Sequence, residues 1–221
     1  MNQQSRSGPL RFDGSRNRAF CLSLLILALS VLSNPGVAAE APDGEGAPVP
    51  TGCDLLAAHP SDPDKITEGL KTAEVMKHLD SAIATCRRDA ALYPDQPRLT
   101  YYLGRSQFYA GQAEAGYTSV KAAADGGHEQ AQFVAGLLAL SGAATGAADP
   151  CLALDFWEKA RAQAHFAATV SVAAHQKMDT FATCQQPDAA SVRASVEALS
   201  GHRYAGEYYN QLLLQVLALA D

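Results

Sequence analysis

Proline and glycine divide most of the chain into segments of about one helix length, and this spacing predicts a fold built of helix hairpins. Alanine, the best helix former, accounts for 42 of the 221 residues, and its small side chain lets helices approach closely. Valine, isoleucine and threonine are too sparse for a large sheet. The sequence therefore predicts an all-α chain whose helices cover residues 80–92, 97–110, 112–125, 128–141, 150–163, 165–177, 188–199 and 202–219.

The central helices are related by internal similarity. Residues 127–136 align with residues 164–173 at an offset of 37, and the preceding helices align at the same offset. Residues 95–104 fit the same frame at an offset of 32, and the difference in length falls in the loop 143–148. Repetition at such a period is typical of stacked helical repeats, in which neighbouring hairpins bury each other's apolar faces.

The repeat has a family resemblance. Residues 156–165, FWEKARAQAH, resemble the "WYEKAAEQGH" stretch of Sel1-like repeats, and residues 131–136, AQFVAG, resemble their "AQYNLG". Tyr102-Leu103-Gly104 with Gly111 is similar to the related tetratricopeptide pattern. The similarity covers residues 80–177, and Ala164 and Ala173 depart from it where the family usually has glycine.

The resemblance implies an α-solenoid of stacked antiparallel helix hairpins that binds other proteins and, like most members of the family, has no activity of its own. On this basis residues 80–177 form the repeats, and residues 178–221 form a C-terminal capping helix pair. Residues 52–79 form an N-terminal head, since residues 53–64 resemble the cysteine-containing head of exported bacterial repeat proteins. The small residues at positions where helices are expected to cross closely are Gly104, Ala123, Gly136, Ala160 and Ala173.

The first 39 residues have the pattern of a secretory signal peptide. Four arginines precede an uncharged run from Ala19 to Ser33, and Pro35-Gly36 and small residues follow it. We expect cleavage after Ala39, a flexible linker over residues 40–51, and a periplasmic or secreted protein that is not inserted in a membrane. The alternative is an uncleaved anchor, for which the apolar run is short.

Four cysteines remain after this cleavage, and an even number in an oxidising compartment predicts two disulfides. Cys53 and Cys86 are 33 residues apart, as are Cys151 and Cys184, and the equal spacing favours pairing within each couple. Zinc is the alternative, but no pair has C-x-x-C spacing.

The net charge of the chain and the motifs that it lacks argue against several classes of function. The net charge of −6 becomes −9 without the four arginines and one aspartate of the signal, which argues against nucleic acid and anionic lipid as partners. The six histidines are scattered, and we expect no metal, no cofactor and no catalytic residue. Asp62 and Asp64 could bind calcium in principle, but the neighbouring prolines favour an ordinary turn.

By analogy with the family, the first helix of each repeat lines a concave surface. The candidate partner-binding groove comprises Arg98, Tyr101, Arg105, Phe108 and Phe133, since aromatic residues and arginine anchor protein interfaces. Two arginines would suit an acidic segment or a free carboxylate. The alternative is that Tyr101 and Phe108 merely pack between repeats and that Arg98 is solvated.

We therefore expect an exported interaction scaffold or adaptor for a protein partner. One alternative is an enzyme, because some disulfide-rich Sel1-like secreted proteins are linked to penicillin binding, although Ser-x-x-Lys is absent here. The other is a structural subunit that self-associates through the apolar residues 203–219.

Overall fold

The computed structural model describes residues 48–143 and 146–219, and this part of the chain is helical and contains no strand. The predicted all-α class is thereby confirmed. The predicted signal peptide and most of the predicted linker lie outside the described residues. Among the residues described, no helix combines the length and the apolar character needed to cross a membrane.

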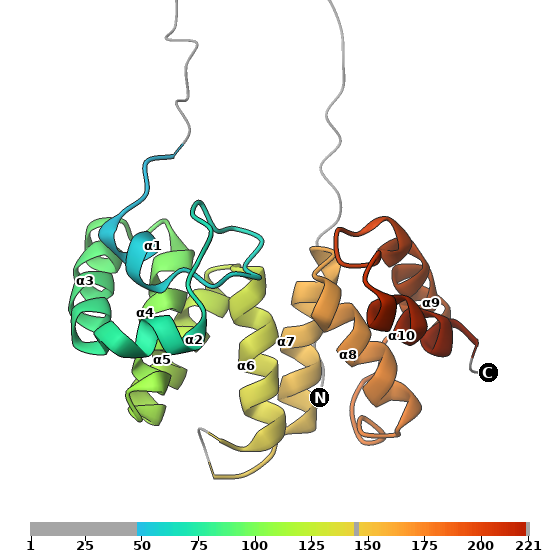
Figure 1. The fold of residues 1–221 in the computed structure, drawn as a ribbon. Coiled ribbons are helices and arrows are strands. Elements are labelled where there is room, and N and C mark those ends of the chain that lie inside the picture. Colours follow the sequence, from blue (N-terminus) through green and yellow to red (C-terminus); the bar gives the residue numbers. More distant parts are fainter. Residues whose placement is uncertain (1–47, 144–145, 220–221) are drawn as a thin grey trace, which may run out of the picture. The chain divides into compact units, whose positions relative to one another are not determined.

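All eight predicted helices are present in the order expected (Figure 1). They are α3 Leu79–Leu92, α4 Pro97–Tyr109, α5 Ala113–Asp125, α6 Glu129–Ser141, α7 Pro150–Ala162, α8 Phe166–Lys177, α9 Ala189–Ala198 and α10 Tyr208–Leu219. Their ends lie where local chemistry sets them. Asp149 caps α7 by accepting the Leu152 N–H at 2.9 Å, and Asp188 caps α9 through Ser191 in the same way.

The last helix is shorter than predicted. It begins at Tyr208 rather than at residue 202, because residues 202–207 form turns after a short 3₁₀ helix, Leu199–Gly201. Side chains satisfy the backbone of these turns. His202 Nδ1 accepts the Tyr204 N–H at 3.2 Å, and Asn210 donates to the Tyr204 carbonyl at 2.9 Å.

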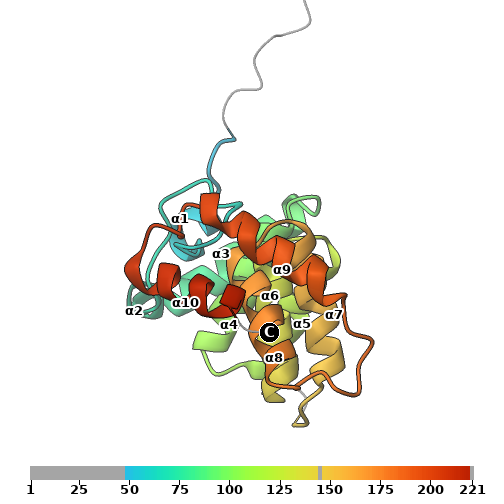
Figure 2. The ribbon, with the colours of Figure 1, turned by 90° about the vertical axis from the view of Figure 1, so that its right-hand side faces the viewer.

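Consecutive helices pack against each other from α3 through α9, and α10 packs on both α9 and α8 (Figures 1 and 2). The aligned repeats make the same contacts. The His128 N–H bonds to the Ala123 carbonyl at 3.1 Å, and 37 residues later the His165 N–H bonds to the Ala160 carbonyl at 3.1 Å. The residue before each histidine is left-handed: Gly127 has φ +91° and Ala164 has φ +62°. The sequence alignment therefore corresponds to a repeated local structure.

The head contains helices that the sequence did not indicate. They are α1 Gly52–Ala57, α2 Thr72–Val75 and a 3₁₀ turn, Met76–His78, that leads into α3. Thr51 and Asp54 form a capping box at the start of α1, which packs on α3 and α4.

Two disulfides join Cys53 to Cys86 and Cys151 to Cys184, with Cα–Cα distances of 4.5 and 5.3 Å. The predicted local pairing is confirmed. One bond ties α1 of the head to α3, and the other ties the start of α7 to the segment after α8. Two such bonds are compatible with an oxidising, extracytoplasmic compartment.

The predicted close helix crossings also occur. A Cβ atom on Gly104 would lie 2.9 Å from the Val120 backbone nitrogen of α5, and a Cβ atom on Gly136 would collide with the Trp157 indole of α7. Ala123, Ala160 and Ala173 are buried. Small residues at these positions therefore allow the close approach of neighbouring helices.

Replacing Gly136 with alanine should destabilise the protein by about 1–3 kcal/mol, because the fully buried Trp157 cannot move aside without losing its bond from Nε1 to the Phe133 carbonyl. Chemical denaturation measures this loss. Gly201→Ala is the control, since a Cβ there meets open space and should change stability by less than about 0.5 kcal/mol. Equal stability of the two variants would contradict the crossing.

Candidate functional site

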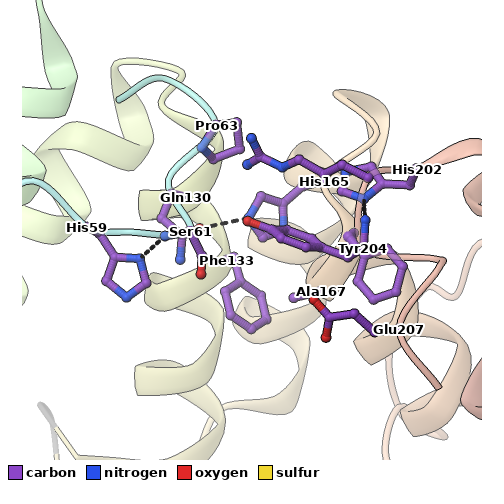
Figure 3. A pocket seen from close by; sticks show the side chains of 12 residues that line it. His59, Ser61, Pro63, Gln130, Phe133, His165, Ala167, His202, Tyr204 and Glu207 are labelled. Carbon is purple, nitrogen blue, oxygen red and sulfur yellow. Dashed lines mark hydrogen bonds between the residues drawn. The ribbon is translucent and has the colours of Figure 1, made fainter. Parts of the chain in front are cut away.

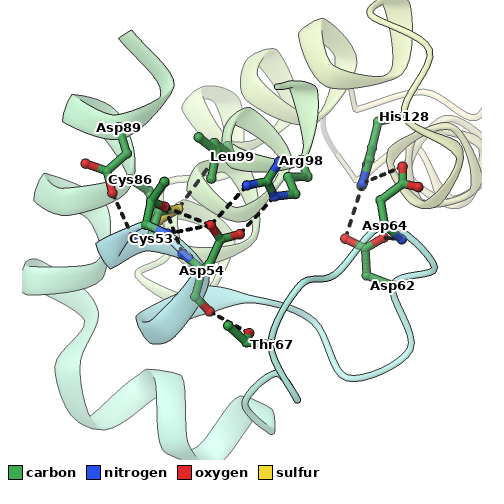
Figure 4. A network of polar contacts seen from close by, with 11 residues as sticks. Cys53, Asp54, Asp62, Asp64, Thr67, Cys86, Asp89, Arg98, Leu99 and His128 are labelled. Carbon is green, nitrogen blue, oxygen red and sulfur yellow. Dashed lines mark hydrogen bonds and ion pairs between the residues drawn. A yellow bond between two sulfur atoms is a disulfide. The ribbon is translucent and has the colours of Figure 1, made fainter. Parts of the chain in front are cut away.

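The predicted groove is not open, because the head covers it. Arg98 makes a two-pronged ion pair with Asp54 of α1, with Nε–Oδ1 at 2.9 Å and Nη2–Oδ2 at 3.1 Å (Figure 4). Asp54 is completely buried, and the Arg98 side chain is 12% exposed. The groove prediction for Arg98 is therefore corrected, as is its alternative of a solvated side chain, since this arginine binds an aspartate of its own chain.

Arg105 holds the end of the head in the same manner. Its guanidinium donates to the carbonyls of Ala57, Ala58 and Leu70 at 2.9, 2.8 and 2.6 Å, and the residue is only 5% exposed. Both predicted anion-binding arginines are thus occupied within the chain, and neither is free for an acidic partner.

The aromatic members of the predicted groove are separated. Tyr101 is buried among the core residues, and Phe108 packs over Gly116 of α5. Both follow the alternative in which they serve packing between helices. Of the five predicted groove residues, Phe133 lines a cavity between the head, α6, α8 and the turns 202–207.

That cavity, of about 370 Å³, is the candidate functional site (Figure 3). Four segments meet around it: the loop 59–63 of the head, the beginnings of α6 and α8, and the turns 202–207. Its walls carry three aromatic rings, those of Phe133, Phe166 and Tyr204, and three imidazoles, those of His59, His165 and His202.

The aromatic side chains are held in place by contacts with one another. Phe133 stacks on His165 with ring centroids 5.1 Å apart, and it also lies against the buried Trp157. Phe166 contacts His202 at 5.1 Å and meets Tyr204 edge to face at 6.0 Å. Such contacts fix the shape of the cavity wall before any ligand arrives.

The hydrogen bonds of His165 determine which of its two ring nitrogens carries the proton. Nδ1 accepts the Ala168 N–H at 3.2 Å as the N-cap of α8, so Nε2 carries the proton and donates to Gln130 Oε1 at 3.1 Å. Burial lowers the pKa of His165 to about 4, and the nearby Asp62 carboxylate opposes this only partly. The imidazole is therefore neutral at pH 7.

The pKa values of the other two imidazoles, those of His59 and His202, are also lowered. Burial, with the charge of Arg105, lowers the pKa of His59 to about 4, and burial also lowers the pKa of His202. The charged side chains of the lining are Arg203 and Glu207, both exposed. At neutral pH the cavity therefore has an uncharged, aromatic interior, and the exposed side chains of Arg203 and Glu207 at its edge carry one positive and one negative charge.

The pKa of His165 predicts a loss of stability in acid. Its folded pKa lies below the unfolded value of about 6.5, so the contribution of neutral His165 is complete above pH 6.5 and is lost as the pH falls toward 4. The loss should reach roughly 3 kcal/mol. His165→Asn keeps a capping side chain without a titrating group, so its unfolding free energy should fall less steeply between pH 6.5 and 4. Parallel curves for the two proteins would contradict this assignment.

A polar cluster lies behind the loop that borders the cavity. His128, the N-cap of α6, points Nε2 toward Asp62 Oδ2 at 3.2 Å and Asp64 Oδ2 at 3.6 Å (Figure 4). His128 and Asp62 have fully buried side chains, whereas that of Asp64 is 54% exposed. Of the described residues, these are the ones whose ligand atoms lie close enough together to hold a metal ion.

Comparison with family models, curated proteins and solved structures finds no match to this chain. The candidate site therefore rests on its own geometry. Sequence reasoning missed it because its walls come from four segments far apart in the chain. One feature of the sequence did point to this region, because His128 and His165 occupy the same repeat position. His128 contacts Asp62 of the loop 59–64, and His165 lines the cavity that this loop borders.

Proposed function

We propose that this protein is an exported binding protein that holds an apolar side chain of a partner protein in the cavity between the head, α6, α8 and the turns 202–207. The observation that supports this most is the preformed aromatic wall of Phe133, Phe166 and Tyr204 around about 370 Å³. Concave, mostly apolar sites with a few polar groups are the usual form of a binding pocket.

The composition of the wall also favours recognition of a protein segment. Aromatic side chains anchor protein interfaces, and Arg203 and Glu207 are exposed where they can contact the backbone or charges of a bound segment. The Arg203 guanidinium lies 4.8 Å from the centroid of the Tyr204 ring, which positions it at this site.

The surrounding architecture supports an adaptor role. The repeated hairpin contacts favour a Sel1-like or tetratricopeptide-like superhelix, and the signal-like leader and the two disulfides favour the periplasm or the exterior as the location. The head then acts as an N-terminal cap that covers the first repeat.

Photo-crosslinking in intact cells tests this function. A benzoylphenylalanine in place of Tyr204 should crosslink one exported or envelope protein, which mass spectrometry identifies. Ala167 lies in the cavity wall, so Ala167→Trp should fill the space and abolish the crosslink. Ala122→Trp, on an exposed position of α5, should leave the crosslink intact.

The outcomes separate the competing functions. A crosslink that survives Ala167→Trp, or no crosslink at all, would refute binding in the cavity. A crosslink to a second copy of the chain would instead support the self-associating subunit, with residues 203–219 as the contact.

A further inference from the structure

We propose that Asp62, Asp64 and His128 form a binding site for a divalent transition-metal ion, with Zn²⁺ as the ion of choice. This site lies outside the cavity, and the inference does not depend on the proposed function. It also departs from the sequence-based expectation of no metal, because loop and helix are brought together only by the fold.

The first observation is a pair of buried atoms that converge without bonding. His128 Nε2 and Asp62 Oδ2 are 3.2 Å apart, yet among the described residues neither atom has a hydrogen-bond partner, and the same holds for the buried hydroxyl of Tyr102. Their side chains are completely buried. A buried acceptor and a buried imidazole nitrogen left in this state carry a cost that a bound ion would remove.

The second observation is the spacing of the three ligand atoms. His128 Nε2 lies 3.2 Å from Asp62 Oδ2 and 3.6 Å from Asp64 Oδ2. For an ion about 2.1 Å from each atom, the angle at the ion between His128 Nε2 and Asp62 Oδ2 would be roughly 100°, and that between His128 Nε2 and Asp64 Oδ2 roughly 118°. Both angles are close to the tetrahedral value. The three atoms lie within 4.8 Å of one another, so a small movement of the exposed Asp64 completes the site.

The loop holds the carboxylates in the required orientation. Asp62 Oδ1 accepts the Asp64 N–H at 3.0 Å, which leaves Oδ2 directed at His128. Ser61 and Pro63 of the same loop border the cavity. An ion would thereby fix the loop that forms one wall of the cavity, and the exposed Asp64 offers it a path from solvent.

The ligand types select the ion. Calcium and magnesium prefer oxygen ligands only, whereas one imidazole and two carboxylates suit Zn²⁺ and leave a fourth position for water. The two aspartate carboxylates of the cluster carry negative charge that a neutral imidazole cannot offset. A divalent cation balances this charge.

Metal binding must change the state of His128. In the ion-free structure Nδ1 accepts the Ala131 N–H at 3.2 Å, so the proton of the neutral ring is on Nε2. An ion at Nε2 requires that proton to move to Nδ1, through solvent and with no net release. The hydrogen bond from the Ala131 N–H to His128 Nδ1 is then lost, so binding of the ion changes the capping of the first turn of α6.

Titration calorimetry of the disulfide-bonded full-length protein with Zn²⁺ is the test. We expect one ion per chain, at least tenfold weaker binding by Asp64→Asn, and no binding at this site by His128→Gln. Asp64 is the decisive position, because its exposed side chain can change without disturbing the core. The control is His78→Gln, which removes an exposed histidine outside the cluster and should bind Zn²⁺ as the native protein does.

A second measurement guards against zinc bound to other histidines. Nitrogen-15 spectra of the imidazoles should show the His128 proton on Nε2 without zinc and on Nδ1 with it. Unchanged His128 signals at saturating Zn²⁺ would overturn the proposal. So would the absence of saturable binding, or equal affinity of the native protein and the Asp64→Asn variant.

Discussion

Replacing Arg98 with alanine should destabilise the protein by about 3–5 kcal/mol, measured by chemical denaturation with both disulfides intact. The substitution leaves the carboxylate of Asp54 completely buried and without its counter-ion. Breaking a buried ion pair from one side costs this much because the remaining charge loses its counter-ion in a site without water, and the hydrogen bonds from Thr51 to Asp54 do not replace that counter-ion. The head should also lose its ionic link to α4, while the hydrogen bonds from Arg105 to the head carbonyls remain.

Lys121→Ala is the matched control for this experiment. Lys121 pairs with Asp125 one turn along α5, and both side chains are about half exposed, so this loss should be at most about 0.5 kcal/mol. Similar destabilisation by the two variants would show that the Arg98 pair is not buried in solution and that the head does not cover α4.

The second large effect concerns the disulfides. Each closes a loop with a sequence separation of 33, so the chain-entropy model assigns each about 3–4 kcal/mol. Cys53 and Cys86 are completely buried, whereas Cys151 is exposed and Cys184 is half-buried. Replacing the buried pair by alanine therefore adds lost packing to the lost cross-link.

We expect Cys53→Ala/Cys86→Ala to lose more stability than Cys151→Ala/Cys184→Ala, by about 1 kcal/mol or more. Denaturation of the two double variants side by side measures the difference. Equal losses would mean that loop closure alone matters, and a larger loss for the second pair would contradict the burial of the head against α3.

The helices were predictable because their ends are local. Asp149-Pro150 and Pro187-Asp188 mark helix starts by capping and by the fixed backbone of proline, and the structure uses both aspartates as caps. The disulfide pairing was equally predictable, because the two pairs of cysteines have the same spacing. The start of α10 was not, because the turns 202–207 are held by the side chains of His202 and Asn210.

The site was harder to predict because burial is a property of the whole fold. Arg98 and Arg105 have the character of a binding surface in sequence, but the head supplies Asp54 and three carbonyl groups that satisfy them. Nothing local to α4 indicates this. His128 and His165 carried the better signal, since a shared repeat position placed both beside segments that now form the candidate sites.

Hydrogen–deuterium exchange of the protein alone and with its crosslink-identified partner tests most directly whether a partner occupies the aromatic cavity. We predict slower exchange in three segments that border the cavity, residues 59–63, 130–133 and 202–207, and unchanged exchange in α5. Protection confined to α9 and α10, or spread evenly over the chain, would contradict binding in the cavity.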